Sequence, residues 1–271
     1  MKYLIIGNGY LGQQFKKYFS NSVMSEVRIK EEKDVLGEIE RVKPDWVLNC
    51  AGVTGRPNID WCEEHKQETF EGNVLLPLMI ARACEKKNVK MMHLGSGCVY
   101  SGDNNGEGWS EDDSPNFAGS FYSKTKALSE DILKDYDVLQ LRLRMPIDSD
   151  ITSERNFIKK ITKYEKVIDV RNSMTIVDDL LEVAKTLTER NKTGLYNVVN
   201  PLPMSHCEIL DLYKKMVDPD FEYEIISVED LHKMTKAERS NCVLDCGKLM
   251  GEIELPTLRE RIVEIFNNYR K

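Results

Sequence analysis

The 271-residue sequence has few histidines, no paired cysteines and no long apolar run. Its four histidines are scattered and its seven cysteines form no Cys-x-x-Cys pair, so the sequence supports neither a metal site nor a disulfide framework. No stretch approaches the roughly 18 apolar residues of a membrane helix, and the opening apolar run is too short for a signal peptide. We therefore expect a cytoplasmic protein with reduced cysteines, no metal and no membrane partner.

A clustered basic face is also missing. The net charge is −7, and the lysines and arginines are dispersed along the chain. A nucleic-acid-binding domain needs a basic patch or stripe, so we expect no nucleic-acid partner. The hydrophobic share of 41% and the charged share of 31% are ordinary for a globular protein with a sizeable core.

Short apolar runs and helical patterns alternate over the first 200 residues. The runs predict strands over residues 2–6, 23–28, 45–52, 89–95, 138–143 and 194–201. The periodicity predicts helices through 11–19, 35–42, 69–86, 120–133, 157–163 and 177–188. This order predicts an α/β fold, a Rossmann doubly wound parallel sheet with a smaller, mostly helical substrate-binding lobe. We assign residues 1–148 and 172–200 to the sheet domain, and 149–171 and 201–271 to the lobe.

A Gly-x-Gly-x-x-Gly turn stands between the first strand and the first helix. Such glycines allow a tight turn and a close approach of backbone to a pyrophosphate at the helix N-terminus, whereas a plain glycine-rich turn is the alternative. The predicted cofactor contacts are Gly7, Asn8, Gly9, Tyr10, Leu11 and Gly12. Arg28, near the end of the second strand, favours NADPH, whereas Glu26 would favour NADH and Arg28 could equally be a solvated surface residue.

Further cofactor contacts are predicted beyond the third strand and in the helix that follows. Asn49, Ala51 and Gly52 lie where ligands of parallel sheets bind. Asn73 is predicted to hold a water or a backbone group near Lys126, with a plain surface asparagine as the alternative.

Ser96, Tyr122 and Lys126 form the pattern of a ketone reductase. Ser96 ends an apolar strand, and Tyr122 and Lys126 share one face of a later helix. A lysine at this spacing is expected to lower the pKa of the phenol, which donates a proton to a carbonyl oxygen as hydride arrives. A partly exposed tyrosine and a surface lysine are the alternative reading.

Cys98 adds a thiol two residues after Ser96 and on the same predicted face. A buried apolar cysteine is the common fate of a free thiol. A thiol beside a ketone can also shuttle the acidic protons of the neighbouring carbons. The spacing alone leaves both readings open.

Together these residues resemble the extended short-chain dehydrogenase/reductases that act on nucleotide sugars. The chain is most similar to the dTDP-4-dehydrorhamnose reductase-like 3,5-epimerase/4-reductases of UDP-L-rhamnose synthesis. The matching motifs are Ala51–Asn58, Asp60–Glu63, Pro115–Phe117, Gly119–Lys126, Arg144–Ile147, Arg155–Ile158, Tyr164–Val167, Asn172–Thr175 and Tyr196–Asn197.

The resemblance implies two chemistries at one carbonyl. Ser96, Tyr122 and Lys126 would reduce the 4-keto group with NADPH, while Cys98 and Lys160 would epimerise C3 and C5. Lys159 is the alternative to Lys160, and burial is expected to lower the pKa of the lysine that acts. The predicted substrate contacts are Val53, Ser96, Gly97, Cys98, Tyr122, Asn156 and Arg239.

The resemblance also implies partners. A separate 4,6-dehydratase would supply the 4-keto sugar, and helix pairs of this fold often make homodimers. Three alternatives stay open: a UDP or a dTDP substrate, a reductase without epimerase activity, and a non-catalytic NADP-binding regulatory subunit.

Overall fold

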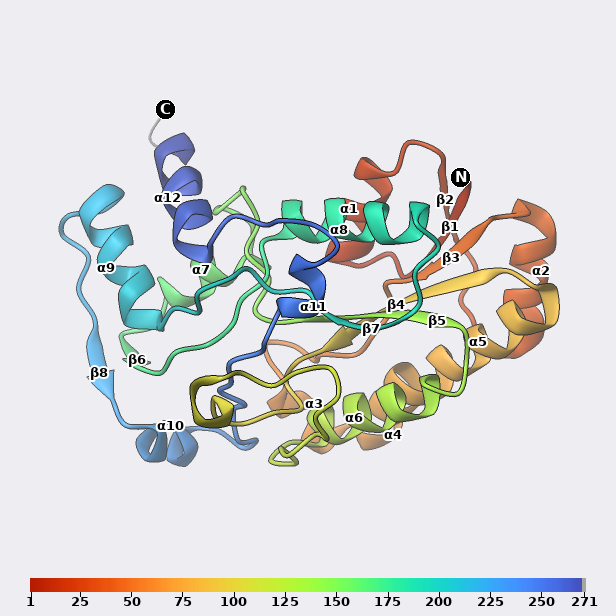
Figure 1. The fold of residues 1–271 in the computed structure, drawn as a ribbon. Coiled ribbons are helices and arrows are strands. Elements are labelled where there is room, and N and C mark those ends of the chain that lie inside the picture. Colours follow the sequence, from red (N-terminus) through yellow and green to blue (C-terminus); the bar gives the residue numbers. More distant parts are fainter. Residues whose placement is uncertain (270–271) are drawn as a thin grey trace.

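A six-stranded parallel sheet forms the centre of the computed structural model, which describes residues 1–269 (Figure 1). Its spatial order is β2-β1-β3-β4-β5-β7. The strands are β1 (Tyr3–Ile6), β2 (Ser22–Met24), β3 (Trp46–Asn49), β4 (Lys90–Ser96), β5 (Val138–Leu143) and β7 (Gly194–Asn197). Because all neighbouring pairs are parallel, their carboxyl ends meet at one edge, and the predicted Rossmann architecture is confirmed.

Helices cover both faces of this sheet (Figure 1). One face carries α1 (Tyr10–Tyr18) and α8 (Val177–Glu189), and the other carries α2 (Glu32–Val42), α5 (Leu76–Lys87) and α6 (Phe121–Leu133). Successive residues of a strand point to opposite faces, so Ile5 packs with Phe15 while Leu4 packs with Val35. Burial on both faces explains why the strands read as continuous apolar runs.

Several predicted elements differ from the structure, and the strands predicted over 45–52 and 194–201 end earlier, at Asn49 and Asn197. β2 ends at Met24, so Arg28 lies in an exposed loop beyond the strand. The helix predicted over 69–86 is divided into α4 (Lys66–Phe70), the π-helical η1 (Glu71–Leu75) and α5. Tertiary packing accounts for this division, because Gly72 lies so close to Val53 that an added Cβ would collide with the valine side chain. Such π-helical turns inside α-helices are frequent at functional sites.

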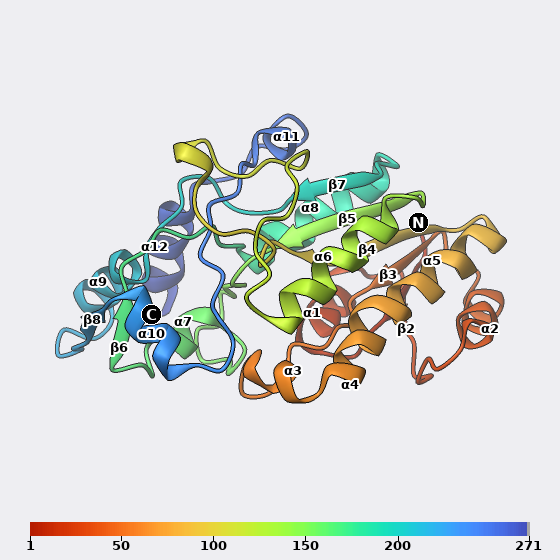
Figure 2. The same cartoon turned by 90° about the horizontal axis from the view of Figure 1, so that it is seen from below.

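The smaller lobe lies beyond the carboxyl ends of the strands in both views (Figures 1 and 2). Its helices are α7 (Phe157–Ile161), α9 (His206–Met216), α10 (Val228–Met234) and α12 (Leu258–Tyr269). α7, α9 and α12 share a separate apolar core that includes Ile158, Ile209 and Ile262, whereas α10 has no buried residue. A parallel pair of strands, β6 (Lys166–Ile168) and β8 (Glu224–Ile226), was not predicted, because three residues give no readable periodicity.

One segment of the predicted lobe returns to the sheet. The short helix α11 (Gly247–Met250) packs beside β7, and Leu249 and Leu255 belong to the core of the large domain. The division of the chain into domain and lobe therefore stays a prediction at this segment.

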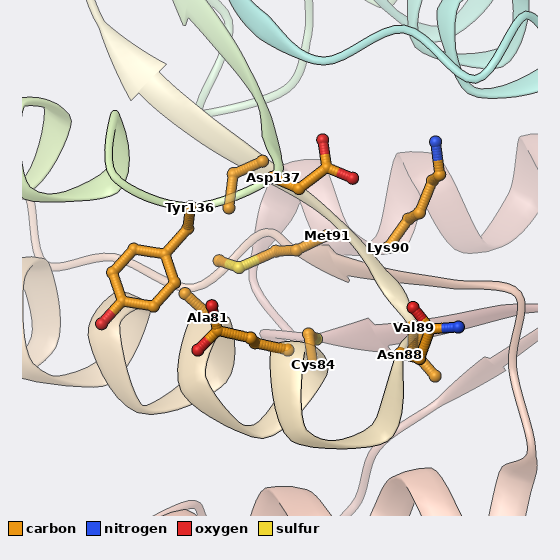
Figure 3. Close-up of a pocket in the computed structure, with 10 residues that line it drawn as sticks. Ala81, Cys84, Asn88, Val89, Lys90, Met91, Tyr136 and Asp137 are labelled. Atoms are coloured by element: carbon orange, nitrogen blue, oxygen red, sulfur yellow. The ribbon is translucent and has the colours of Figure 1, made fainter.

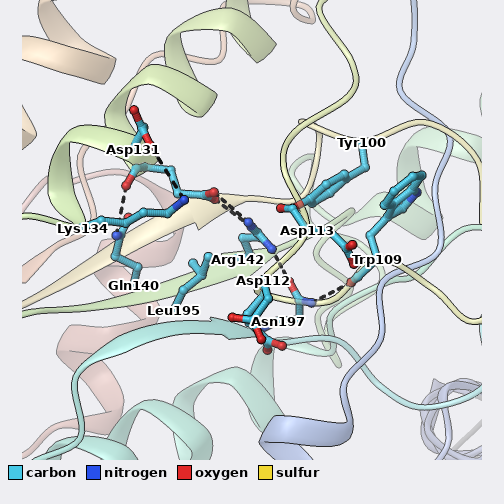
Figure 4. Close-up of polar contacts among 12 residues, drawn as sticks. Tyr100, Trp109, Asp112, Asp113, Asp131, Lys134, Gln140, Arg142, Leu195 and Asn197 are labelled. Carbon is cyan, nitrogen blue, oxygen red and sulfur yellow. Dashed lines mark hydrogen bonds and ion pairs between the residues drawn. The ribbon is translucent and has the colours of Figure 1, made fainter. Parts of the chain in front are cut away.

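The long loop between β4 and α6 spans residues 97–120 and contains the 3-10 turn η2 (Asn104–Gly106). An arginine of β5 holds this loop and is itself neutralised by a buried ion pair with α6 (Figure 4). Arg142 of β5 donates to both carboxylate oxygens of Glu130 at 2.7 Å, and to the carbonyl oxygen of Ser110 at 3.2 Å. Its guanidinium lies 4.9 Å from the ring centre of Tyr100, which stacks on Trp109. The loop that begins with Cys98 is thereby tied to the sheet.

Candidate active site

The three glycines of the first turn have different physical roles. Gly7 has a φ of 111°, and an added Cβ at Gly7 or Gly12 would collide with backbone atoms of Ala51 or Gly7 respectively. A Cβ at Gly9 would meet no atom within 4 Å. Gly9 is also the N-cap of α1, which has neither a side-chain cap nor an acidic residue in its first turn. This open, uncapped helix end fits a pyrophosphate.

The neighbours of these glycines are held by contacts within the chain. Asn8 accepts a hydrogen bond from Gln13, and Leu11 packs against the core of the sheet. The hydroxyl of Tyr10 donates to the carboxylate of Asp148, where the chain passes into the lobe. The turn is thus connected to the segment that leads to α7.

Two buried asparagines form hydrogen bonds to the backbone of the loop after β3. Asn49 lies 2.9 Å from His93 and accepts a hydrogen bond from the Ala51 amide. Asn73, in η1, accepts from the Val53 amide at 2.7 Å and donates to the Val53 carbonyl at 2.9 Å. Asn73 therefore holds backbone, as predicted, but that backbone belongs to Val53 next to Gly52.

Ser96, Tyr122 and Lys126 are all buried at the carboxyl end of β4. Ser96 is 6% exposed, Tyr122 is 8% exposed and Lys126 is 6% exposed. Ser96 hydrogen-bonds to the Tyr122 side chain, and Lys126 Nζ donates to the Leu94 carbonyl at 3.1 Å. The N-cap Ser120 starts α6 and so fixes the position of Tyr122 two residues later.

The expectation that Lys126 lowers the pKa of Tyr122 is wrong for this arrangement. Burial raises the pKa of Tyr122, because the phenolate would lose its hydration, and Ser96 only partly offsets this. Burial lowers the pKa of Lys126 to about 8. A tyrosine that keeps its proton is the form that an acid catalyst of carbonyl reduction requires.

Cys98 lies beside Ser96 and interacts with Tyr122. Its amide donates to Ser96 Oγ at 3.2 Å, and its thiol contributes to the raised pKa of Tyr122. Arg144 Nη1 lies 3.5 Å from Cys98 Sγ. Gly97 allows this approach, because an added Cβ there would collide with the Arg144 and Leu244 side chains.

Lys160 and Asn156 belong to α7. Burial, followed by the charge of Arg155, lowers the pKa of Lys160, as predicted. Asn156 is fully buried, caps α7 through the Ile158 amide, and donates to the carbonyls of Asp148 and Asp150. Its side-chain polar atoms thus form hydrogen bonds within the protein. Asn156 would therefore affect substrate binding indirectly, by fixing the position of α7.

Arg239 and Arg28 take positions that the sequence did not predict. Arg239 donates to both carboxylate oxygens of Asp60, at 2.8 and 2.9 Å, and so joins the lobe side of the site to the helix α3 (Asp60–Glu64). Its contact with substrate stays a prediction. Arg28 is exposed.

Arg144 is the residue of this site to which sequence reasoning gave no role. It appeared only as part of the Arg144–Ile147 motif, directly after β5. A cation at the end of an apolar strand was the available signal, but the sequence alone does not show that its side chain is buried beside Cys98.

A pocket of about 260 Å³ lies away from these residues (Figure 3). Lys90, Tyr136 and Asp137 line it, at the amino ends of β4 and β5. Ligands of parallel sheets bind at the opposite, carboxyl ends, so this pocket has no part in the site. In residues 1–269 no three His, Cys, Asp or Glu side chains form a group that could hold a metal ion. None of the described helices has the length and apolarity needed to cross a membrane.

Comparison with known proteins gives concordant matches. Residues 1–271 match the family model of the RmlD substrate binding domain. The chain is 46% identical to the bifunctional dTDP-4-dehydrorhamnose 3,5-epimerase/dTDP-4-dehydrorhamnose reductase of Arabidopsis thaliana, over 88% of this chain and 81% of that protein. The crystal structure of the L780 UDP-rhamnose synthase from Acanthamoeba polyphaga mimivirus superposes with a TM-score of 0.94 at 35% identity, covering 98% of both chains.

A longer relative contains a further activity. The chain is 42% identical, over 97% of its length, to a trifunctional UDP-glucose 4,6-dehydratase/UDP-4-keto-6-deoxy-D-glucose 3,5-epimerase/UDP-4-keto-L-rhamnose-reductase of Arabidopsis thaliana. The match covers 41% of that protein, so the chain spans about two fifths of the trifunctional relative.

Proposed function

The chain belongs to the RmlD substrate binding domain family, and from this premise we propose that it is a bifunctional nucleotide-sugar 3,5-epimerase and 4-reductase. The proposed reaction converts UDP-4-keto-6-deoxy-D-glucose into UDP-L-rhamnose with NADPH. The observation that carries it is the placement of a buried tyrosine, a buried serine, a buried lysine and the half-buried Cys98 thiol at one end of β4.

The reductive half rests on Ser96, Tyr122 and Lys126. The turn around Gly9 would hold NADPH, which would supply the hydride for C4 of the sugar. Tyr122 gives its proton to the C4 oxygen, and Ser96 donates a hydrogen bond to the same oxygen. Both groups also stabilise the charge that this oxygen bears when a neighbouring carbon loses a proton.

The epimerising half rests on Cys98 and Lys160. Carbons 3 and 5 flank the carbonyl, so one stabilised oxygen serves both epimerisations. One of the two side chains removes a proton and the other delivers a proton to the opposite face of the ring. Burial, followed by the charge of Arg155, lowers the pKa of Lys160 and so brings its neutral form closer to the working pH, which favours proton exchange.

The substrate must come from a dehydratase. A 4-keto-6-deoxy sugar is the product of 4,6-dehydration, and the trifunctional relative unites that activity with the other two. We propose that a separate 4,6-dehydratase supplies this chain with its substrate.

The test is one incubation of the purified protein with UDP-4-keto-6-deoxy-D-glucose and NADPH in heavy water. We expect UDP-rhamnose that carries deuterium at C3 and C5, identified by NMR and mass spectrometry. Reduction without deuterium at these carbons would leave a reductase alone, and no consumption of NADPH would refute the proposal. Parallel incubations with the dTDP sugar and with NADH identify the preferred base and cofactor.

A further inference from the structure

Arg144 is a buried cation without a carboxylate partner. It is 1% exposed, and in residues 1–269 no carboxylate lies within ion-pair distance of it. Its hydrogen bonds go to neutral groups, namely Ser240 Oγ at 2.8 Å, Asn172 Oδ1 at 2.7 Å and the Ser240 carbonyl at 3.0 Å. Its Nε is buried without any partner.

Arg142, two residues earlier, provides the contrast. It is equally buried, but Glu130 neutralises it through two bonds of 2.7 Å. An ion buried without its opposite costs several kcal/mol. The unpaired charge of Arg144 therefore destabilises the folded protein more than the paired charge of Arg142 does. A negative group that forms beside Arg144 during the reaction would offset this free-energy cost.

Cys98 is the group placed to become that anion. Its sulfur lies 3.5 Å from Arg144 Nη1. The other charged or titratable groups that face the thiol are Tyr122 and Lys126 from α6 and Cys242 from the segment after α10. Burial raises the pKa of both Tyr122 and Cys242, so these two stay neutral. Among residues 1–269, the charged groups that face the thiol are thus the two cations Arg144 and Lys126.

We propose that Arg144 holds Cys98 as a thiolate and is thereby a positioning residue for epimerisation, which rests on the proposed function. The thiolate takes the proton of C3 or C5, and the electrons of the broken C–H bond move to the C4 oxygen. The Lys160 ammonium then protonates the carbon from the opposite face. Cys98 then releases its proton to water, and Lys160 takes one up from water. The number of protons is therefore unchanged over the step, and no group is oxidised.

The first test measures the thiol without substrate or cofactor. Iodoacetamide alkylates each cysteine at neutral pH, and mass spectrometry gives the rate at Cys98 and at the half-buried Cys246. Burial raises the pKa of Cys246 to about 11 and slows its reaction, so free glutathione serves as the reference thiol. We expect Cys98 to react about tenfold faster than glutathione, because the thiolate is the nucleophile. Equal rates for glutathione and for Cys98 in the unaltered protein would overturn the proposal, whatever the variants do.

The variants separate charge from structure. We expect Arg144→Met to slow alkylation of Cys98 by about tenfold, and Arg144→Lys to restore most of the rate. Ser240→Ala removes a partner of Arg144 and a bond to the Tyr100 carbonyl, but leaves the cation, so the rate should stay within about twofold. Equal effects of Arg144→Met and Ser240→Ala would assign Arg144 to the fold alone.

The last readout connects the thiol with catalysis. Arg144→Met should lose deuterium incorporation at C3 and C5, yet still reduce UDP-4-keto-L-rhamnose, which needs no epimerisation. Loss of both activities in equal measure would contradict the proposal. If the unaltered protein incorporates no deuterium but its Cys98 is still alkylated rapidly, the proposed epimerase function fails and the effect of Arg144 on the thiol stands.

Discussion

Lys126 directs its ammonium at the carbonyl oxygen of Leu94, 3.1 Å away, with only 6% of the residue exposed. Burial lowers the pKa of Lys126 from 10.5 to about 8. Between these values the unfolded chain binds more protons than the folded one. The free energy of unfolding therefore rises with pH across this window, and the penalty of the buried charge is present in full below pH 8.

Lys126→Met should raise the free energy of unfolding at pH 7 by about 1–3 kcal/mol, because it removes the buried charge. The gain should shrink as the pH approaches 10.5, since the lysine is then neutral in both states. Urea unfolding at pH 7 and pH 10 measures the difference. Lys124→Met, at an exposed position of the same helix, is the control and should show no such dependence. A gain that is equal at both pH values would contradict the argument.

Gly9→Ala and Gly12→Ala should impair different properties of the protein, namely NADPH binding and stability respectively. Alanine at Gly9 meets no protein atom, so its melting temperature should stay unchanged while NADPH binding weakens by at least about tenfold. Alanine at Gly12 collides with the Gly7 carbonyl and should destabilise the protein even without cofactor, by about 2 kcal/mol or more. Thermal unfolding and NADPH titration of both variants check this, and tight NADPH binding by Gly9→Ala would place the pyrophosphate elsewhere.

Asp60→Asn and Arg239→Lys distinguish two roles of Arg239. If the arginine only joins the lobe to α3, both variants break the same paired hydrogen bonds and should change KM and stability alike. If it also binds the nucleotide sugar, Arg239→Lys should raise KM by a further factor of about ten. Steady-state kinetics with varied sugar nucleotide, alongside thermal unfolding, separates these outcomes.

Tyr122→Phe and Cys98→Ser should divide the two chemistries. Tyr122→Phe removes the proposed proton donor and should lower the rate of NADPH consumption by on the order of 10²–10⁴-fold. Cys98→Ser should abolish deuterium incorporation at C3 and C5, yet reduce a sugar that is already epimerised. Circular dichroism confirms that both variants fold. Consumption of NADPH by Tyr122→Phe at the parent rate would exclude it as the donor.

Much of the fold follows from local sequence patterns. β4 and β5 are buried on both faces, so their apolar runs give the strand positions to within a residue or two. The Gly7–Gly12 turn and the Tyr122–Lys126 pair are also local, since the spacing that defines each lies within six residues. These are the parts of the site that sequence reasoning located.

The remainder depends on contacts between distant residues. Arg144 meets Cys98 across 46 positions, and Asn73 holds Val53 across 20 positions, so neither contact has a local signature. The π-helical turn forms because Gly72 admits Val53, which periodicity cannot reveal. The direction of the Tyr122 pKa shift likewise depends on burial, a tertiary property that outweighs the lowering effects of Ser96 and Arg144.

The bonds from Arg142 to Glu130 and to the loop after β4 also determine how the protein opens. A loop held only at its ends would fluctuate independently of the sheet. In this loop the Ser110 carbonyl accepts a hydrogen bond from Arg142 of β5, and the Tyr100 ring, which stacks on Trp109, lies against the same guanidinium. Local opening near Cys98 would have to break these contacts together. The Cys98 thiol should therefore belong to the same cooperative unit as the central strands, and amide hydrogen exchange around it should report on global unfolding.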